Sequence, residues 1–134
     1  MTYTLFTDGG ARGNPGPAGI GAILVDDKNN VVFELSKYIG ETTNNVAEYK
    51  ALIEGLLKTK EKEIKNIDCI LDSELVVKQL NGLYKVKNES MHIYFTQVKK
   101  LEKFFDKVTY RHVKRELNSR ADSLVNEALD SLNA

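Results

Sequence analysis

Residues 67–73, with the sequence Ile-Asp-Cys-Ile-Leu-Asp-Ser, carry the clearest signal for the fold. The run from Ile67 to Leu71 has the length of a short strand, and helical patterns stand on both sides of it. A strand of this kind between two helices is typical of a buried strand in an α/β sheet. Asp72 follows directly, so a carboxylate is expected where this strand ends.

Three further strands are expected ahead of this segment, at residues 3–7, 20–25 and 31–38. The polar residues 26–30 between the last two favour a hairpin. Residues 8–19 hold both prolines and five of the nine glycines of the chain. This composition predicts an irregular loop whose backbone can approach a ligand closely.

The spacing of apolar residues predicts the remaining elements. We expect helices at 45–60, 73–80, 91–105 and 121–132, and a last strand at 108–113. A hairpin-built half thus precedes an alternating half, and this order predicts the α/β class with a mixed sheet flanked by helices. Since no linker, repeat or low-complexity segment interrupts the chain, residues 1–134 are expected to form a single, free-standing domain.

The composition excludes several classes of protein. With 42% hydrophobic residues, the 134-residue chain can build a core. No apolar run is long enough to span a membrane and the N-terminus lacks a signal pattern, so a cytoplasmic protein is expected. Cys69 is the single cysteine, which excludes an internal disulfide and a thiolate metal site. The formal net charge is zero, but basic residues gather at Arg111, Lys114, Arg115 and Arg120.

Four acidic residues stand out, and each has an ordinary structural explanation by itself. Asp8 precedes two glycines and could start a turn. Glu48 stands three residues after Asn45, as in a capping box. Asp72 could cap the helix that follows it, and Asp122 would carry favourable charge in a first helical turn.

Taken together, these four carboxylates favour a shared site. Asp8 and Asp72 are expected at the ends of two strands, which is where ligand sites lie if the strands pair in parallel. Glu48 and Asp122 are expected in first helical turns that point toward the same edge. Four carboxylates in one pocket repel each other unless cations neutralise them. Because no Cys/His set suits zinc, the pattern predicts a phosphodiester hydrolase with two Mg²⁺ ions.

Five segments of the chain resemble type 1 ribonuclease H in order and spacing. They are residues 7–10 (Thr-Asp-Gly-Gly), 13–17 (Gly-Asn-Pro-Gly-Pro), 42–48 (Thr-Thr-Asn-Asn-Val-Ala-Glu), 71–73 (Leu-Asp-Ser) and 118–122 (Asn-Ser-Arg-Ala-Asp). The resemblance covers nearly the whole chain and implies a five-stranded mixed sheet in the order 3-2-1-4-5. It implies an endoribonuclease that hydrolyses the RNA strand of RNA–DNA hybrids with Mg²⁺ or Mn²⁺, leaving 5′-phosphate and 3′-hydroxyl ends. The family's four metal ligands fall on Asp8, Glu48, Asp72 and Asp122.

The resemblance also implies a substrate-binding surface. Its members here are Gly9, Gly10, Asn14, Thr43, Asn44 and Asn45, with Thr43 at a position that binds a DNA-strand phosphate. Distinguishing RNA from DNA requires contact with 2′-hydroxyls in a wide minor groove, which glycine backbone and asparagine amides suit. Turn and cap formation is the alternative for the asparagines. Double-stranded RNA is an additional candidate substrate, and a monomer is expected.

Two features depart from familiar bacterial members and match a compact, archaeal-like branch. The basic, tryptophan-containing insertion is missing, because the chain has no tryptophan and residues 81–90 are too short to hold it. Weaker or more salt-sensitive binding is expected, with Lys85 and Lys87 as a partial substitute. In place of a loop histidine, Arg115 is favoured as the auxiliary catalytic residue, since a guanidinium can stabilise developing charge. His112 is expected to face the core or the sheet edge.

Other functions remain open at this point. The main alternative is a catalytically weak nucleic-acid-binding module with the same fold. A domain attached to a larger machine, such as a reverse transcriptase, is a further one. All four metal-ligand positions are occupied by acids, which favours the enzyme.

Overall fold

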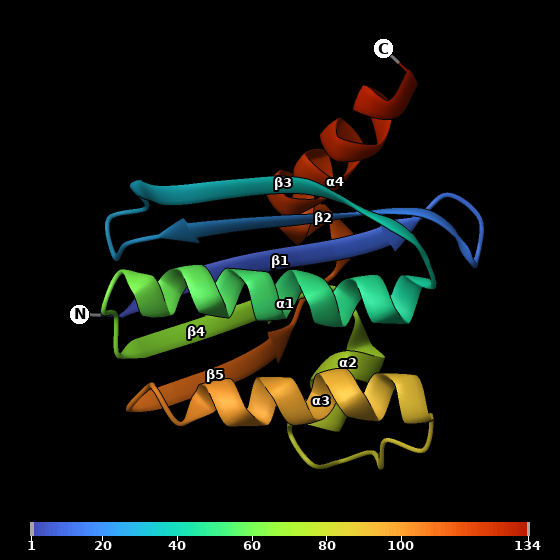
Figure 1. The fold of residues 1–134 in the computed structure, drawn as a ribbon. Coiled ribbons are helices and arrows are strands. Elements are labelled where there is room, and N and C mark those ends of the chain that lie inside the picture. The colour runs from blue at the N-terminus through green and yellow to red at the C-terminus, as the bar shows by residue number, and fades with distance from the viewer. Residues whose placement is uncertain (1, 134) are drawn as a thin grey trace.

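Five strands form one mixed sheet in the order β3-β2-β1-β4-β5, which confirms the expected topology (Figure 1). The computed structural model describes residues 2–133. The strands are β1 (Tyr3–Ala11), β2 (Gly16–Val25), β3 (Val31–Thr42), β4 (Asn66–Leu71) and β5 (Lys107–His112). Pairing is antiparallel between β1, β2 and β3 and parallel between β1, β4 and β5, so the sheet changes character at β1.

Helices cover both faces of the sheet. On one face lie α1 (Asn44–Glu61), α2 (Glu74–Leu80) and α3 (Glu89–Glu102), and on the other lies α4 (Ser119–Asp130) (Figure 1). The short 3₁₀ turns η1 (Arg115–Asn118) and η2 (Ser131–Asn133) flank α4. Within residues 2–133, no helix combines the length and the apolarity needed to cross a membrane.

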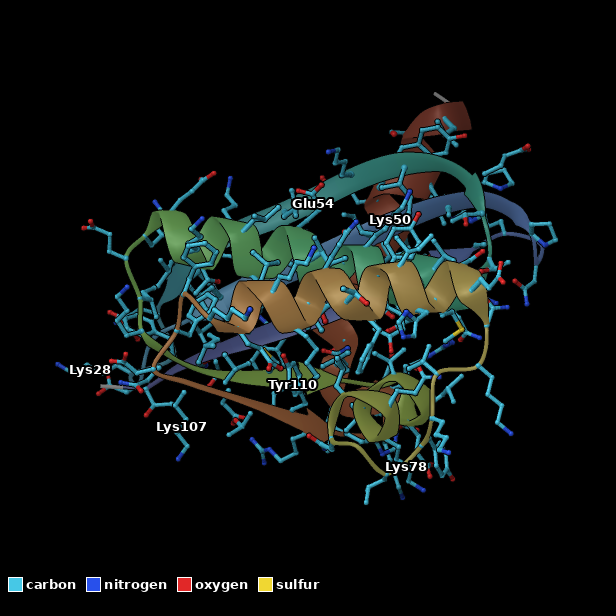
Figure 2. All side chains as sticks on the ribbon, turned by 60° about the horizontal axis from the view of Figure 1, so that its bottom comes forward. Lys28, Lys50, Glu54, Lys78, Lys107 and Tyr110 are labelled. Carbon is cyan, nitrogen blue, oxygen red and sulfur yellow. The ribbon has the colours of Figure 1, made fainter. Side chains whose placement is uncertain are left out.

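The larger core lies between the sheet and α1, α2 and α3. Leu5 and Cys69 from the strands and Leu52 and Val98 from the helices are fully buried there. At the sheet edge, the Tyr110 hydroxyl donates a 2.6 Å hydrogen bond to Glu102, which ties β5 to α3 (Figure 2). A smaller cluster, Ile23, Val25 and Leu124 with Phe6 against it, fixes α4 on the opposite face.

The prediction of an irregular loop over residues 8–19 was wrong for most of that segment. β1 continues to Ala11 and β2 begins at Gly16, and the two strands pair from Thr4↔Val25 to Ala11↔Ala18. Glycine-rich sequence was read as loop, but ladder hydrogen bonds along a neighbouring strand override that local preference. Asp8 therefore lies inside a strand.

The predicted C-terminal helix was also placed too far along the chain. α4 ends at Asp130, and Leu132, the last member of the expected apolar stripe, lies in η2 with 47% of its surface exposed. The other helices begin or end within three residues of their expected limits. These differences leave the expected order of elements unchanged.

Candidate active site

The site lies at the point where β4 ends while the neighbouring strand β1 continues. The parallel pairing of β1 with β4 ends at Thr7↔Leu71, and Asp8 and Asp72 are the next residues along the chain. Beyond that point β1 stays paired on its other side with β2. The sheet thus opens on one side of Asp8, which leaves room beside two carboxylates.

Glu48 reaches this opening from the second turn of α1. Its Oε1 accepts a 3.1 Å hydrogen bond from the Gly9 backbone N–H, while Oε2 is buried without a partner. The approach of α1 depends on the glycine, because a Cβ at Gly9 would lie 2.2 Å from the Ala47 carbonyl oxygen. The capping explanation of Glu48 was wrong, since Thr43 caps α1 by accepting from the Val46 N–H.

Asp122 comes from the opposite face of the sheet, in the first turn of α4. This helix rests on β2 at Gly21, the residue that pairs with Asp8, and a Cβ there would lie 2.4 Å from the Ala121 carbonyl oxygen. Asn126, one turn later, donates to Asp122 at 3.4 Å. Close packing of α4 on the sheet therefore brings Asp122 to Asp8.

Asp72 is free for a role in the cleft because Ser73 caps α2. The Ser73 hydroxyl accepts from the Val76 N–H at 3.3 Å, so the alternative in which Asp72 caps this helix was wrong. The Asp72 Oδ2 is buried without a hydrogen-bond partner. A buried carboxylate oxygen without a hydrogen bond is costly unless a ligand or cation satisfies it.

Three of the carboxylates crowd together. One oxygen each of Asp8, Glu48 and Asp72 lies within 4.8 Å of the other two. Burial, with the neighbouring charges of Asp72 and Asp122, raises the pKa of Asp8 from 3.8 to about 7. Burial, followed by the charge of Asp8, also raises the pKa of Glu48 well above its usual range. The metal-free cluster therefore favours bound protons, because burial disfavours the charged carboxylates and neighbouring charges repel them.

The donor set fits a divalent cation. All the groups are hard carboxylate oxygens, and neither Glu48 Oε2 nor Asp72 Oδ2 has a hydrogen-bond partner in the protein. A bound cation would satisfy these oxygens and offset the burial and the repulsion that raise the pKa of Asp8. The acidic cluster could thus hold a divalent metal ion.

Around the carboxylates lies an open cleft of about 440 Å³. It is lined by Asp8, Gly9, Gly10, Ala11, Arg12, Asn44, Asn45, Glu48, Asp72, Ser73, Arg115, Asp122, Val125, Asn126 and Leu129. Four of the six residues expected to bind substrate, Gly9, Gly10, Asn44 and Asn45, are among them. The cleft therefore brings the acidic residues and most of the expected substrate surface together.

The remaining two expected substrate residues support the cleft wall. Asn14 accepts from the Asn44 N–H at 3.0 Å, and Asn44 in turn accepts from the Ala11 N–H at 2.8 Å. Thr43 caps α1, as described above. These bonds tie the β1–β2 loop to the start of α1, which differs from the turn and cap formation that was the alternative, and Asn44 also lines the cleft.

Of the two candidate auxiliary residues, Arg115 is at the cleft. It begins η1, its side chain is 78% exposed, and its Nε lies 3.7 Å from Asp72 Oδ2. His112 ends the edge strand β5, is exposed and is not part of the cleft lining among the described residues. Lys85 and Lys87 line a separate hollow with Leu83 and Tyr84.

Sequence reasoning gave no role to Asn118, although it lies in one of the matching segments. Asn118 is 1% exposed, and its Nδ2 donates a 2.8 Å hydrogen bond to the Thr7 carbonyl oxygen. This bond thus anchors the start of α4 to β1. Thr7 comes one residue before Asp8, and Asn118 comes four residues before Asp122. Its place in the same segment as Asp122 was the signal that the sequence offered. The bond itself joins residues 111 positions apart and could not be read from the sequence.

Comparison with known proteins places the chain among ribonucleases H. A family model described as reverse transcriptase-like matches residues 6–128. The ribonuclease HI of Halobacterium salinarum is 41% identical over 125 residues, covering 93% of this chain and 63% of the relative. The ribonuclease H of Chlorobium limicola is 34% identical, covering 94% of both chains. The chain spans only 36% of the length of mycobacterial relatives that are 40% identical to it.

A solved structure is also closely similar. A ribonuclease H1 described as isolated from compost by a metagenomic approach, determined in complex with an RNA/DNA hybrid, superimposes with a TM-score of 0.94. It is 44% identical and covers 98% of this chain and 99% of that one. The similarity therefore includes the strands, α1 and α4, which carry the four carboxylates.

Proposed function

This chain belongs to the type 1 ribonuclease H family, and we propose that it is an endoribonuclease that hydrolyses the RNA strand of RNA–DNA hybrids. The products are 5′-phosphate and 3′-hydroxyl ends. We assign metal binding and catalysis to Asp8, Glu48, Asp72 and Asp122. The observation that carries the proposal is the convergence of these four side chains, from both faces of the sheet, in one cleft.

Two divalent cations, Mg²⁺ or Mn²⁺, are the proposed cofactors. When bound, they would activate the attacking water and stabilise the leaving oxygen. The protein's own contribution is to hold four carboxylates in a fixed arrangement. Asp8 is held inside the β1–β2 ladder, and Glu48 is oriented by its bond from the Gly9 N–H.

The neutral residues of the cleft would read the substrate. Gly9 and Gly10 present backbone without a side chain, and Asn44 and Asn45 present amides beside it. Such groups can contact ribose 2′-hydroxyls in the minor groove of an A-like duplex. Arg115 would stabilise negative charge on the scissile phosphate, since it is always protonated and lies next to Asp72.

The substrate and assembly state are part of the proposal. The hybrid is the favoured substrate because a similar ribonuclease H1 is known in complex with one. Double-stranded RNA is a second candidate, because its A-form minor groove also displays 2′-hydroxyls. We propose that residues 1–134 form one domain, which the single continuous sheet supports, and that this domain acts as a monomer.

A cleavage assay tests the proposed function. A labelled RNA–DNA hybrid, the matching double-stranded RNA and the matching DNA duplex are incubated with wild type in Mg²⁺ and in Mn²⁺. Asp8→Asn and Asp72→Asn are expected to lose at least about a hundredfold in kcat, because each removes a ligand charge. Asp68→Asn is the matched control. Asp68 lies on β4, the strand that precedes Asp72, but its side chain bonds to Arg111 and Thr109 outside the cleft.

The result separates the enzyme from the binding module. Cleavage by wild type that is lost in both cleft variants and kept in Asp68→Asn supports the proposed mechanism. Equal cleavage by Asp8→Asn and wild type would refute it. Tight hybrid binding without cleavage in either metal would instead favour a non-catalytic module.

A further inference from the structure

The cleft extends beyond the four carboxylates. A second part lies between the end of β1 and the outer half of α4, and its lining is Gly10, Ala11, Arg12, Val125, Asn126 and Leu129. These six residues include one cation and no carboxylate. The metal chemistry proposed above makes no use of this part, so its chemical character needs a separate explanation.

Arg12 is held in this part of the cleft at both ends of the residue. Its backbone N–H donates to the Pro17 carbonyl oxygen at 2.8 Å, next to the bond from the Ala11 N–H to Asn44. Its guanidinium Nη2 contacts Asp130 Oδ1 at 2.5 Å, which directs the side chain toward the end of α4. The backbone is thus fixed, while the direction of the charged group depends on one ion pair.

That ion pair is open to water. The side chains of Arg12 and Asp130 are 44% and 67% exposed. Exposed pairs of this kind contribute little to stability and exchange partners easily. Arg12 can therefore leave Asp130 for another anion at small cost, and a guanidinium is well matched to a phosphate because it can donate two parallel hydrogen bonds.

The charges around the cleft favour a contact between Arg12 and a phosphate. Among the described lining residues, four carboxylates face two cations, Arg12 and Arg115. Arg115 lies beside Asp72, and Arg12 lies at the α4 side. A polyanionic duplex is positioned mainly through its phosphates, so cations on the cleft wall supply affinity and register.

We infer that Arg12 binds a backbone phosphate of the RNA–DNA hybrid on the α4 side of the cleft. Asp130 holds the guanidinium in place in the free protein and competes with the phosphate for it. The inference rests on the proposed function, which it extends by naming a binding residue outside the acidic cluster. It makes Arg12 a substrate-binding residue, with Asp130 as its positioning partner.

The test compares steady-state cleavage of one hybrid by four variants at about 50 to 300 mM KCl. Arg12→Ala should raise KM about three- to tenfold with little change in kcat, and reduce the slope of log KM against log salt by about one. Arg12→Lys should restore most of that slope, because it keeps the charge. Asp130→Asn should leave KM unchanged or lower it, because it frees Arg12.

Arg111→Ala is the matched control. Arg111 also forms an exposed ion pair, with Asp68 at 3.0 Å, but on the sheet edge and outside the cleft lining. Thermal unfolding of every variant shows whether it is folded at the assay temperature. If Arg12→Ala is unfolded, the KM values of Arg12→Lys and Asp130→Asn still decide whether Arg12 binds a phosphate or only forms a structural ion pair.

Three outcomes would overturn the inference. Arg12→Ala could match Arg111→Ala in KM and salt slope, while wild type still cleaves the hybrid. Asp130→Asn could raise KM as much as Arg12→Ala does, which would make the ion pair a structural unit and not a competitor. Failure of wild type to bind or cleave the hybrid would overturn the proposed function as well, and so is distinct from the first two.

Discussion

At the scale of single residues, Asp8 links the proposed chemistry to stability. Burial and the charges of Asp72 and Asp122 raise its pKa to about 7, so the native state binds this proton more tightly than the unfolded chain does. The associated stability is present below about pH 4 and is lost as pH rises through about 7. Metal-free protein should therefore lose stability over that range.

Asp8→Asn should remove this loss. The neutral amide cannot ionise, so the variant is expected to be more stable than metal-free wild type at pH 8, by up to a few kcal/mol. Mg²⁺ should raise the unfolding temperature of wild type more at pH 8 than at pH 5, and that of Asp8→Asn much less. Thermal unfolding with and without the metal checks this, and Asp68→Asn should behave as wild type. If Mg²⁺ stabilised Asp8→Asn as much as it stabilises Asp68→Asn, the assignment of Asp8 as a ligand would be contradicted.

Arg115 and His112 make a second pair for comparison. Arg115 lies 3.7 Å from Asp72 in the cleft, whereas His112 is exposed at the end of β5. Arg115→Ala should lower kcat about tenfold or more, through lost stabilisation of phosphate charge. His112→Ala should leave kcat within about twofold. Single-turnover cleavage measures both, and the reverse order of effects would make His112 the auxiliary residue.

Asn118 is expected to position Asp122. Asn118→Ala leaves the buried Thr7 carbonyl oxygen without its 2.8 Å donor, which should cost about 1–3 kcal/mol of stability. Since α4 loses its tie to β1 beside Asp8, kcat should fall while KM changes little. Asn81→Ala is the control, because the Asn81 amide also donates to a carbonyl oxygen of a strand, that of Tyr110 at 3.2 Å, at a more exposed place away from the cleft. A purely structural role would give the two variants the same kcat.

At the scale of elements, the seating of α4 on β2 determines where Asp122 lies. A Cβ at Gly21 would stand 2.4 Å from the Ala121 carbonyl oxygen and 2.7 Å from Leu124 Cβ. Neither neighbour can retreat without moving the helix. The glycine is therefore a condition for the site as well as for the packing.

Gly21→Ala should test this dependence. The substitution is expected to destabilise the protein by about 1–3 kcal/mol and to lower kcat, because α4 must shift away from the sheet. Gly10→Ala is the steric control, since a Cβ there would meet only Val125 Cγ1 at 3.8 Å. Denaturant unfolding compares the two stabilities. If Gly21→Ala is as stable as Gly10→Ala, α4 is not seated as described.

At the scale of the whole molecule, one sheet contributes residues to two hydrophobic cores. The larger core lies under α1, α2 and α3 and the smaller under α4, and β1 and β2 contribute residues to both. Loss of either core would remove support from the same two strands. The domain should therefore unfold in one cooperative transition, with a free energy of unfolding of roughly 5–15 kcal/mol.

Two probes can check this cooperativity. Far-UV circular dichroism follows the backbone, and the fluorescence of the six tyrosines follows packing, without interference because the chain has no tryptophan. Their urea transitions should coincide. An early loss of one signal would show that α4 and its site melt separately from the rest.

Much of this arrangement could be predicted from the sequence. The order of elements, the α/β class and the four acids depend on local patterns such as the buried strand at 67–71 and the apolar spacing of the helices. Residues 8–11 were assigned wrongly because their strand conformation comes from pairing with β2, which glycine-rich sequence does not reveal. The same holds for the caps at Thr43 and Ser73, which depend on where the helices begin.

The sequence by itself therefore determined which residues could carry the chemistry and which elements bear them, since periodicity and residue type are local properties. Only the tertiary structure decided how they meet. The end of β4 at Leu71 opens the sheet beside Asp8, and glycines at 9 and 21 let α1 and α4 approach from opposite faces. Asn118 and Arg12 gained their roles through contacts across 111 and 118 residues of sequence. Such contacts arise from the packing of distant segments, which no local pattern encodes.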